Sequence, residues 1–459
     1  QGLDSKYTQD NVYWLTFGGE PGVRMVSRDV APLKATVPDY FPASQRFEVN
    51  NGYLSWFPVD GDDERWYWAV IQATDGSASW NYPFLLSQPY PGTASLTISV
   101  VGYLNIPHHV EVLLNGEKVG DTGLWSGKTR QTLEMSISPG LLVAGENTIE
   151  VRCPNDTGQG YDVVAVDWFN LDYPSAYTTT SDVLDFKFDQ SGTWKFQIDG
   201  YSTNQLTAFD LSNPLALKKL SNYSIDPSGP GYAVSFEDTL DTQKQYWVGS
   251  TALFRSVESI EGDIPSNLAS PSNAADHIII THRDFINQAH TLRDFRYSQG
   301  LRSVVVDVQD IYDQFSYGVI TPSAINDFLA YAYANWESPA PSFVVLMGDG
   351  HYDPKDYYGY GIPSFIPPYL LPVDPWITET AADNRYVTLV GDDNMPDMML
   401  GRMSVNTAAE AAAFVNKIIA YEQAPVDETW QMSIMAVTDD AESSGNYPLI
   451  SDSVIDCCI

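Results

Sequence analysis

FVVLMGDGHYD, residues 343–353, is the stretch that decides the fold of the C-terminal part of this chain. Its first five residues, Phe343–Met347, are all apolar, and a short continuous run of this kind is typical of a strand buried on both faces of a parallel sheet. Two runs upstream have the same character, HIII at 277–280 and SVVVDV at 303–308. Together the three runs predict neighbouring buried strands.

Helical patterns separate these runs. Apolar residues recur at helical spacing between 285 and 295, and Gly300 follows as a stop signal. Thr321 and Pro322 open a second helix, and a third begins near Thr407. The alternation of strands and helices implies parallel pairing with right-handed crossovers. The carboxyl ends of the strands therefore meet at one edge, where ligands bind in such sheets.

Before residue 265 the chain consists of short alternating segments separated by Gly, Pro, Asn and Asp, which predict β-sandwich modules. The predicted strands are 10–17, 95–103, 109–114, 132–137, 147–151, 163–171 and 185–198. Asn115 and Gly116 predict a tight hairpin turn. The aromatic cluster at 66–68 is interpreted as core or interdomain packing, with carbohydrate stacking as the alternative.

The predicted fold is multidomain, with all-β sandwich modules followed by an α/β parallel-sheet domain. A Ser- and Pro-rich segment at 265–273 marks the clearest boundary. The predicted divisions are an N-terminal β region with a β-sandwich at 1–174, a second β module at 175–264, a linker at 265–275 and the α/β domain at 276–459.

Composition narrows the function classes. The 459 residues hold 59 acidic and 24 basic side chains, for a net charge of -35, which disfavours nucleic acid and anionic lipid as partners. No apolar run approaches the roughly 20 residues that a membrane-spanning helix needs. The first residue is Gln1 rather than Met, and basic residues are scarce, so we expect a processed, extracellular protein. Three cysteines cannot form a disulfide framework.

Acidic side chains gather near the predicted strand ends with few basic neighbours. They are Asp349, Asp383, Asp392, Asp393 and Asp397. Carboxylates held together need a cation, a raised pKa or exposure to water. In an extracellular setting calcium suits them, so the sequence predicts a structural calcium site, with solvated carboxylates as the alternative.

Four segments in order resemble the front half of the catalytic domain of gingipain-type cysteine peptidases, which have a caspase-like fold. They are VVLMGDG (344–350), ADNRYVTLVGDD (382–393), PDMMLGRM (396–403) and KIIAYE (417–422). The resemblance covers about 276–452, and the β modules are also similar to N-terminal regions of long members. It implies a secreted or cell-surface endopeptidase that acts on proteins or peptides.

The residues that perform catalysis in that family have no counterpart here. The family uses a cysteine nucleophile and a histidine in a His-Gly motif, but no histidine follows His351. Cys457 and Cys458 are interpreted as buried helix residues. We therefore expect no catalytic residue in this chain, and we expect the C-terminal half of the peptidase domain to be its partner.

The resemblance also assigns two acidic residues. It places a supporting acid at Asp440, just after a strand expected at 433–437, and a substrate-binding carboxylate at Asp452, at an expected helix start. A simple helix cap is the alternative role for Asp452.

Two functions follow from these patterns. In the first, the chain is part of a secreted or surface cysteine endopeptidase and lacks the half with the catalytic His and Cys. In the second, it is a non-catalytic surface or filament-forming protein that has kept a peptidase-like scaffold, since a fold does not fix a function.

Overall fold

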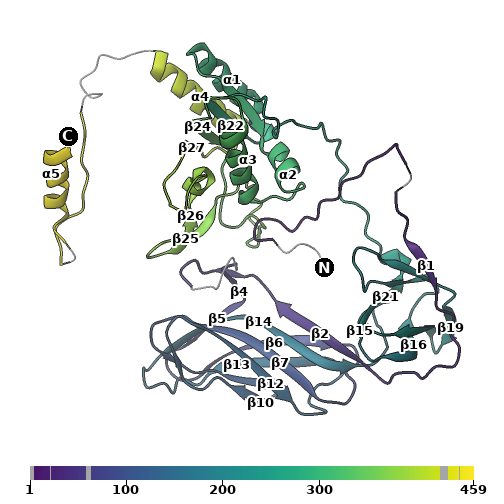
Figure 1. Cartoon of the computed structure of the whole chain (residues 1–459). Coiled ribbons are helices and arrows are strands. Elements are labelled where there is room, and N and C mark those ends of the chain that lie inside the picture. Colours follow the sequence, from purple (N-terminus) through teal and green to yellow (C-terminus); the bar gives the residue numbers. More distant parts are fainter. Residues whose placement is uncertain (1–4, 21, 58–63, 424–432, 444, 459) are drawn as a thin grey trace.

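The computed structural model describes residues 5–20, 22–57, 64–423, 433–443 and 445–458. Figure 1 shows a β-sandwich at the bottom, a smaller β module beside it and an α/β unit above them. The N-terminal segment runs between these three parts. This architecture confirms the predicted fold class, with β-rich modules first and a parallel-sheet α/β unit after them.

The large sandwich pairs two antiparallel sheets. One has the order β12-β7-β14-β2, with β5 also paired to β14, and the other has the order β10-β9-β13-β6. The bounds are β2 (Phe41–Glu48), β5 (Ala69–Ala73), β6 (Ala78–Leu86), β7 (Ala94–Gly102), β9 (Glu111–Leu114), β10 (Glu117–Asp121), β12 (Arg130–Ile137), β13 (Gly145–Cys153) and β14 (Asp162–Ser175). Alternating residues of both sheets form one core, in which the ring of Phe169 stacks on Phe47 at 4.6 Å.

The predicted hairpin turn is confirmed. Asn115 and Gly116 have φ values of 50° and 84°, and Leu114 pairs with Glu117 across the turn. Three short antiparallel pairs lie outside the main sheets: β3 (Gly52–Tyr53) with β4 (Trp66–Tyr67), β8 (Pro107–His108) with β11 (Trp125–Ser126), and β25 (Leu370–Asp374) with β26 (Thr378–Ala381).

The second β module has a five-stranded sheet, β1-β18-β17-β21-β15, and a three-stranded sheet, β16-β20-β19. The bounds are β1 (Val26–Asp29), β15 (Val183–Phe188), β16 (Gly192–Tyr201), β17 (Leu206–Asp210), β18 (Lys218–Ser221), β19 (Ser224–Ser228), β20 (Gly231–Leu240) and β21 (Lys244–Ser250), followed by the short helix η1 (Thr251–Leu253). β1 pairs in parallel with β18, so the N-terminal segment supplies an edge strand to this module. The predicted domain boundaries remain a prediction.

The α/β unit has four parallel strands in the order β23-β22-β24-β27. They are β22 (His277–Thr281), β23 (Ser303–Asp307), β24 (Phe343–Met347) and β27 (Met399–Met403). Helices α1 (Ile286–Ser298) and α4 (Ala408–Gln423) pack on one face, and α2 (Val308–Phe315) and α3 (Pro322–Asn335) pack on the other. The short helices η2 (Arg283–Phe285) and η3 (Asp383–Val387) complete the unit.

The sequence analysis did not predict helix α2, because Val308, its first residue, was included in the strand predicted at 303–308. In the structure the strand ends at Asp307, whose side chain accepts a hydrogen bond from the backbone N–H of Gln309 at 3.0 Å. An aspartate in this position caps a helix. Val308, Ile311 and Tyr312 then follow at helical spacing and are buried.

Three expectations for the ends of the chain were wrong. Residues 10–17 and 433–437 form no strand, and both segments expose apolar side chains, such as Phe17 at 98% and Met435 at 84%. Both lack a neighbouring strand in the described structure, and an unpaired extended segment is not a strand. Helix α5 (Tyr447–Cys458) begins five residues before Asp452, because Asn446 supplies the cap by accepting a hydrogen bond from Leu449 N–H at 3.2 Å.

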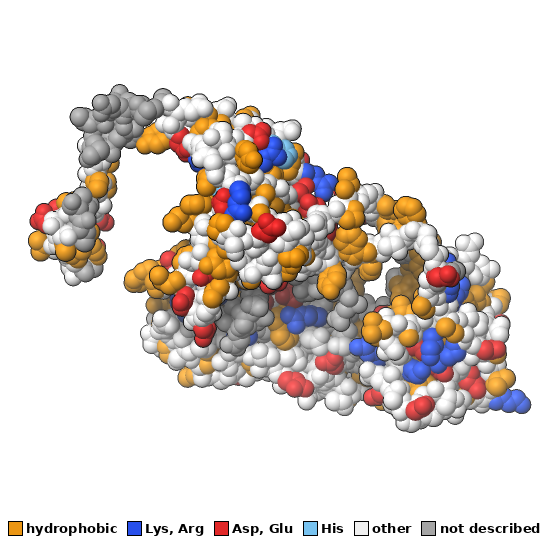
Figure 2. All heavy atoms as spheres, turned by 45° about the horizontal axis from the view of Figure 1, so that its top comes forward, with side chains coloured by type: hydrophobic (Ala, Val, Ile, Leu, Met, Phe, Trp, Pro, Cys, Tyr) orange, Lys and Arg blue, Asp and Glu red, His pale blue; other side chains and the backbone are white. Residues whose placement is uncertain are grey.

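Helix α5 stands apart from the rest of the molecule (Figure 1), and hydrophobic side chains lie on the surface of this separate lobe in Figure 2. They include Leu449, Ile450 and Val454, each more than half exposed. Cys457 is exposed as well, which corrects the expectation that it is buried. Among the described helices, none combines the length and the apolar character required to span a bilayer.

Candidate functional site

The carboxyl ends of the parallel strands form the edge, called the rim below, at which the sequence predicted a site. The chain leaves β24 through Gly348, Asp349 and Gly350. A Cβ atom on Gly350 would lie 2.2 Å from the carbonyl oxygen of Ile366, so only glycine allows the returning chain to approach so closely. The backbone N–H groups of Phe365 and Ile366 donate to the carbonyl oxygen of Asp349 at 2.9 and 3.2 Å.

Arg402 organises the rim from β27. Its guanidinium pairs with the Asp383 carboxylate at 2.6 Å and donates to the carbonyl oxygens of Gly348 at 3.0 Å and Ile366 at 2.9 Å. Burial alone would lower the pKa of Arg402, but the hydrogen bond and the charge of Asp383 outweigh it and raise the pKa above its ordinary value. One charged side chain thus ties together three separate segments of the rim.

The structure gives most of the five predicted calcium ligands partners within the protein. Asp383 binds Arg402, and Asp349 accepts a hydrogen bond from the Asn406 side chain at 3.1 Å. Asp397 accepts hydrogen bonds from the N–H groups of Leu389 and Val390, Asp393 accepts one from Met395 N–H, and Asp392 is exposed. The five carboxylates are thus not gathered into one cage, and a calcium ion at these residues remains a prediction.

One different acidic group is closely packed in the described part of the chain. The carboxylate oxygens of Asp263, Asp310 and Asp313 lie within 4.8 Å of one another. Burial, together with the charges of Asp307 and Asp313, raises the pKa of Asp310 to about 6. No sequence pattern predicts this group, because Asp263 belongs to the segment before the linker and the other two lie on α2.

The two acidic residues assigned from the family resemblance lie away from the rim. Asp440 is exposed in an extended segment, and Asp452 is exposed in the second turn of α5. The helix N-terminus therefore does not act on Asp452, so capping no longer explains it. The roles of both residues remain predictions.

The thiols and imidazoles do not combine into a catalytic pair among the described residues. Cys153 is buried in the sandwich core, where burial raises the pKa of its thiol to about 12. His351 lies on the loop after β24, and its ring nitrogens contact the Ile362 carbonyl oxygen at 2.8 Å and the Asp353 N–H at 3.2 Å.

The sequence analysis missed a contact region between the sandwich and the rim. The carboxylate of Glu379 on β26 accepts a hydrogen bond from the Tyr53 hydroxyl at 2.7 Å and pairs with Arg65 at 3.4 Å and with Lys6. Trp66 packs against Tyr357 and Tyr358, while Tyr67 and Trp68 lie in hydrophobic cores, which confirms the interpretation of the aromatic cluster at 66–68 as core or interdomain packing. No sequence pattern connects residues this far apart, although a glutamate in a short strand was a possible signal.

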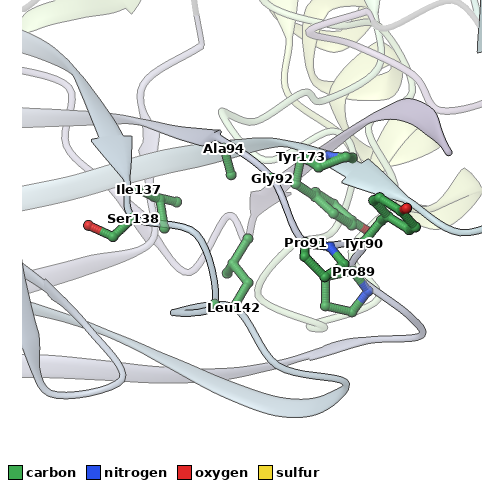
Figure 3. A pocket seen from close by; sticks show the side chains of 11 residues that line it. Pro89, Tyr90, Pro91, Gly92, Ala94, Ile137, Ser138, Leu142 and Tyr173 are labelled. Carbon is green, nitrogen blue, oxygen red and sulfur yellow. The ribbon is translucent and has the colours of Figure 1, made fainter. Parts of the chain in front are cut away.

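Two hollows lie near these parts. A polar cavity of about 460 Å³ opens where the sandwich meets the rim loop, lined by Glu48, Val49, Asn50, Asn51, Glu64 and Tyr357. A smaller cavity of about 60 Å³ lies at one end of the sandwich, between prolines and the side chains of Tyr173, Ile137 and Leu142 (Figure 3). Neither cavity reaches the carboxyl ends of the parallel strands themselves, although Tyr357 of the loop after β24 lines the larger one.

His109 on the sandwich has two carboxylate partners. His109 contacts Asp156 through Nδ1 at 2.8 Å and Asp121 through Nε2 at 2.9 Å. Burial would lower the pKa of His109, but hydrogen bonds to Asp156 and Asp121 outweigh burial and raise it. The imidazolium form, which donates from both nitrogens, is therefore favoured in the folded protein.

The substitution His109→Gln is expected to destabilise the protein more at pH 5.5 than at pH 9. A raised folded-state pKa adds stability that is complete below the unfolded pKa and is lost as pH rises through the folded value. Urea unfolding at both pH values measures this difference. His351→Gln, whose ring contacts backbone groups only, serves as the control, and an equal loss at both pH values for His109→Gln would contradict the charged pairing.

Comparisons with known proteins place the α/β unit in context. Residues 270–456 match the model of Peptidase family C25, which confirms the resemblance seen in the sequence. The fold of the chain is similar to that of dimeric latent PorU from Porphyromonas gingivalis, with a TM-score of 0.61 and 18% sequence identity over 91% of this chain. This chain spans 41% of the length of that protein.

A part of the chain is also similar to smaller solved structures. The C-terminal CBM6 of LamC, a marine laminarinase from Zobellia galactanivorans, matches 28% of this chain and 98% of its own length, with 13% identity and a TM-score of 0.16. No curated protein matches this sequence.

Proposed function

Because residues 270–456 match Peptidase family C25, we propose that this chain is the front part of a cysteine endopeptidase that acts on protein or peptide substrates. The observation that carries the proposal is the preorganised rim of the parallel sheet. From β27, Arg402 ties the exit from β24 to the returning loop and to Asp383 there, at the edge where substrates bind in such sheets. The nucleophilic cysteine and its histidine would come from the C-terminal half of the domain.

The edge of β27 supports a continuation of the sheet. β27 pairs with β24 on one side only among the described residues, and α4 follows it as a crossover helix would. Residues 433–437 form no strand in the described structure, but their composition, with exposed Ile434, Met435 and Val437, would suit a further parallel strand once the C-terminal half of the domain is present. Placed there, the strand would bring Asp440 to the rim, as the family resemblance implies.

We also propose an extracellular location, at the cell surface or secreted. The net charge of -35 and the scarcity of basic residues fit this location. On the face shown in Figure 2, Lys and Arg side chains form small separate groups rather than one continuous patch.

Purified residues 1–459 are expected to show no thiol-dependent cleavage of casein or of a peptide library. The reason is that Cys153 is buried and Cys457 lies on a helix away from any described histidine. A chain extended by the C-terminal half is expected to cleave the same substrates. Cleavage by residues 1–459 that Cys457→Ala or Cys458→Ala abolishes would contradict the assignment of catalysis to the C-terminal half. An extended chain without activity would favour the structural alternative.

A further inference from the structure

We propose that the β-sandwich and the N-terminal peptide are positioning elements of the rim, which hold the loop after β24 in one conformation through a clasp around Glu379. The clasp consists of Lys6, Tyr53, Arg65 and Glu379. The effect of the clasp on catalysis rests on the proposed function. The effect of the clasp on the conformation of the loop concerns this chain alone.

The loop after β24 needs external support. Residues 349–369 contain no helix or strand, and a long loop of this kind carries a large entropic cost of ordering. Its own fastening is local: the buried Asp353 carboxylate accepts hydrogen bonds from the N–H groups of Tyr357 and Tyr358 at 2.8 and 2.9 Å. These bonds shape one turn, and bonds of His351 with Ile362 and of Phe365 and Ile366 with Asp349 join the two ends of the loop, so the tyrosines of its middle part are left to other contacts.

Aromatic side chains of the sandwich supply these contacts. Tyr53 stacks on Tyr352 with ring centroids 4.7 Å apart, and Trp66 meets Tyr357 and Tyr358 edge to face at 4.8 and 5.0 Å. The backbone N–H of Tyr53 also donates to the Tyr358 hydroxyl at 3.1 Å. The short β3–β4 ribbon thus covers the outer side of the loop.

Glu379 is the centre of the clasp. Its side chain and that of Arg65 are each only 2% exposed, and its backbone N–H donates to the Ser55 carbonyl oxygen at 3.1 Å. Burial, together with the hydrogen bond to Glu379, raises the pKa of Tyr53 well above its ordinary value, so Tyr53 remains a neutral donor. Two cations and one phenol therefore converge on a single buried carboxylate, an arrangement that favours one geometry over alternatives.

The N-terminal peptide closes the clasp from a third direction. Lys6 pairs with Glu379, and the backbone N–H of Leu370 donates to the Tyr7 hydroxyl at 3.0 Å. Both strands of the β25–β26 hairpin are thus held by residues 6–7. The hairpin closely follows Phe365 and Ile366, whose N–H groups bind the Asp349 carbonyl oxygen at the end of β24, so order in the clasp is transmitted to the rim.

Tyr53→Phe is the test, because it removes the hydroxyl that Glu379 accepts and keeps the ring that stacks on Tyr352. Hydrogen exchange is measured by mass spectrometry on the purified chain. The backbone amides of residues 350–381 are expected to exchange about fivefold faster, as the loss of one net hydrogen bond predicts, with no change in the second β module. Tyr223→Phe is the matched control, since its hydroxyl donates to the Leu206 carbonyl oxygen far from the rim.

Unchanged exchange in 350–381, or an equal increase in all three parts of the chain, would overturn the proposal. In the extended chain, Tyr53→Phe is expected to lower kcat/KM for peptides, mainly through KM, while Tyr223→Phe leaves it unchanged. Equal kinetics for both variants, with faster exchange in Tyr53→Phe, would remove the link to catalysis and keep the coupling. An inactive extended chain would contradict the proposed function, but the conclusion from hydrogen exchange about the loop would still hold.

Discussion

Arg402→Met is expected to destabilise the α/β unit by about 2–4 kcal/mol, because the substitution leaves a carboxylate and two carbonyl oxygens without their donor. Methionine fills much of the volume of arginine, so the effect reports the lost charge and hydrogen bonds rather than a cavity. The orphaned groups are Asp383 and the carbonyls of Gly348 and Ile366. Urea unfolding, followed by tryptophan fluorescence and by exchange of the β24 amides, measures the loss.

Arg293→Met is the matched control for this substitution. Arg293 pairs with its neighbour Asp294 on the surface of α1, with both side chains more than a third exposed. Its removal is expected to cost less than about 0.5 kcal/mol. Equal losses for the two variants would show that the interactions of Arg402 at the rim add nothing to stability.

Glu379→Gln is expected to cost about 3–5 kcal/mol, because it leaves two cations at a buried site without their counter-charge. The side chain of Arg65 is 2% exposed and cannot turn to water without moving the ribbon that carries it. The measurement is the same urea unfolding, read from the sandwich and the α/β unit separately. Loss of cooperativity between the two parts is expected together with the lower stability.

The double variant Glu379→Gln with Arg65→Met is expected to recover part of that loss, since a buried ion pair replaced by neutral groups is tolerated better than a broken one. Glu48→Gln, which removes a carboxylate from an exposed pair with Arg46, is the control. If the two losses in the double variant simply add, Arg65 and Glu379 do not act on each other.

Local patterns in the sequence predicted most of the regular structure. The apolar runs at 277–280 and 343–347 form buried parallel strands. Such a run has too few polar side chains for the water-facing side of an exposed strand or an amphipathic helix. Gly300, with φ of 92°, follows the end of α1 as its sequence position indicated. Each of these features depends on a few adjacent residues, which is why the sequence alone was sufficient.

Features that depend on distant partners could not be predicted. Arg402 and Asp383 are separated by η3 and a turn, and Glu379 and Arg65 belong to different parts of the molecule. The acidic residues near strand ends suggested a cation, but two of these carboxylates, Asp393 and Asp397, accept hydrogen bonds from backbone N–H groups instead. The strand expected at 10–17 does not form because it lacks a distant partner among the described residues. An alternating pattern marks a segment that can form a strand, but the strand forms only when a neighbouring strand pairs with it.

The long reach of the N-terminal segment sets the order in which this protein can fold. Lys6 and Glu379 are 373 residues apart, and β1 must await β18, so the segment around Lys6 and β1 acquires its partners long after it has itself been synthesised. During that interval Tyr13, Leu15 and Phe17, which remain exposed even in the finished structure, offer an apolar extended segment to other chains. Productive folding therefore requires that this segment be kept from aggregating until the α/β unit has been made.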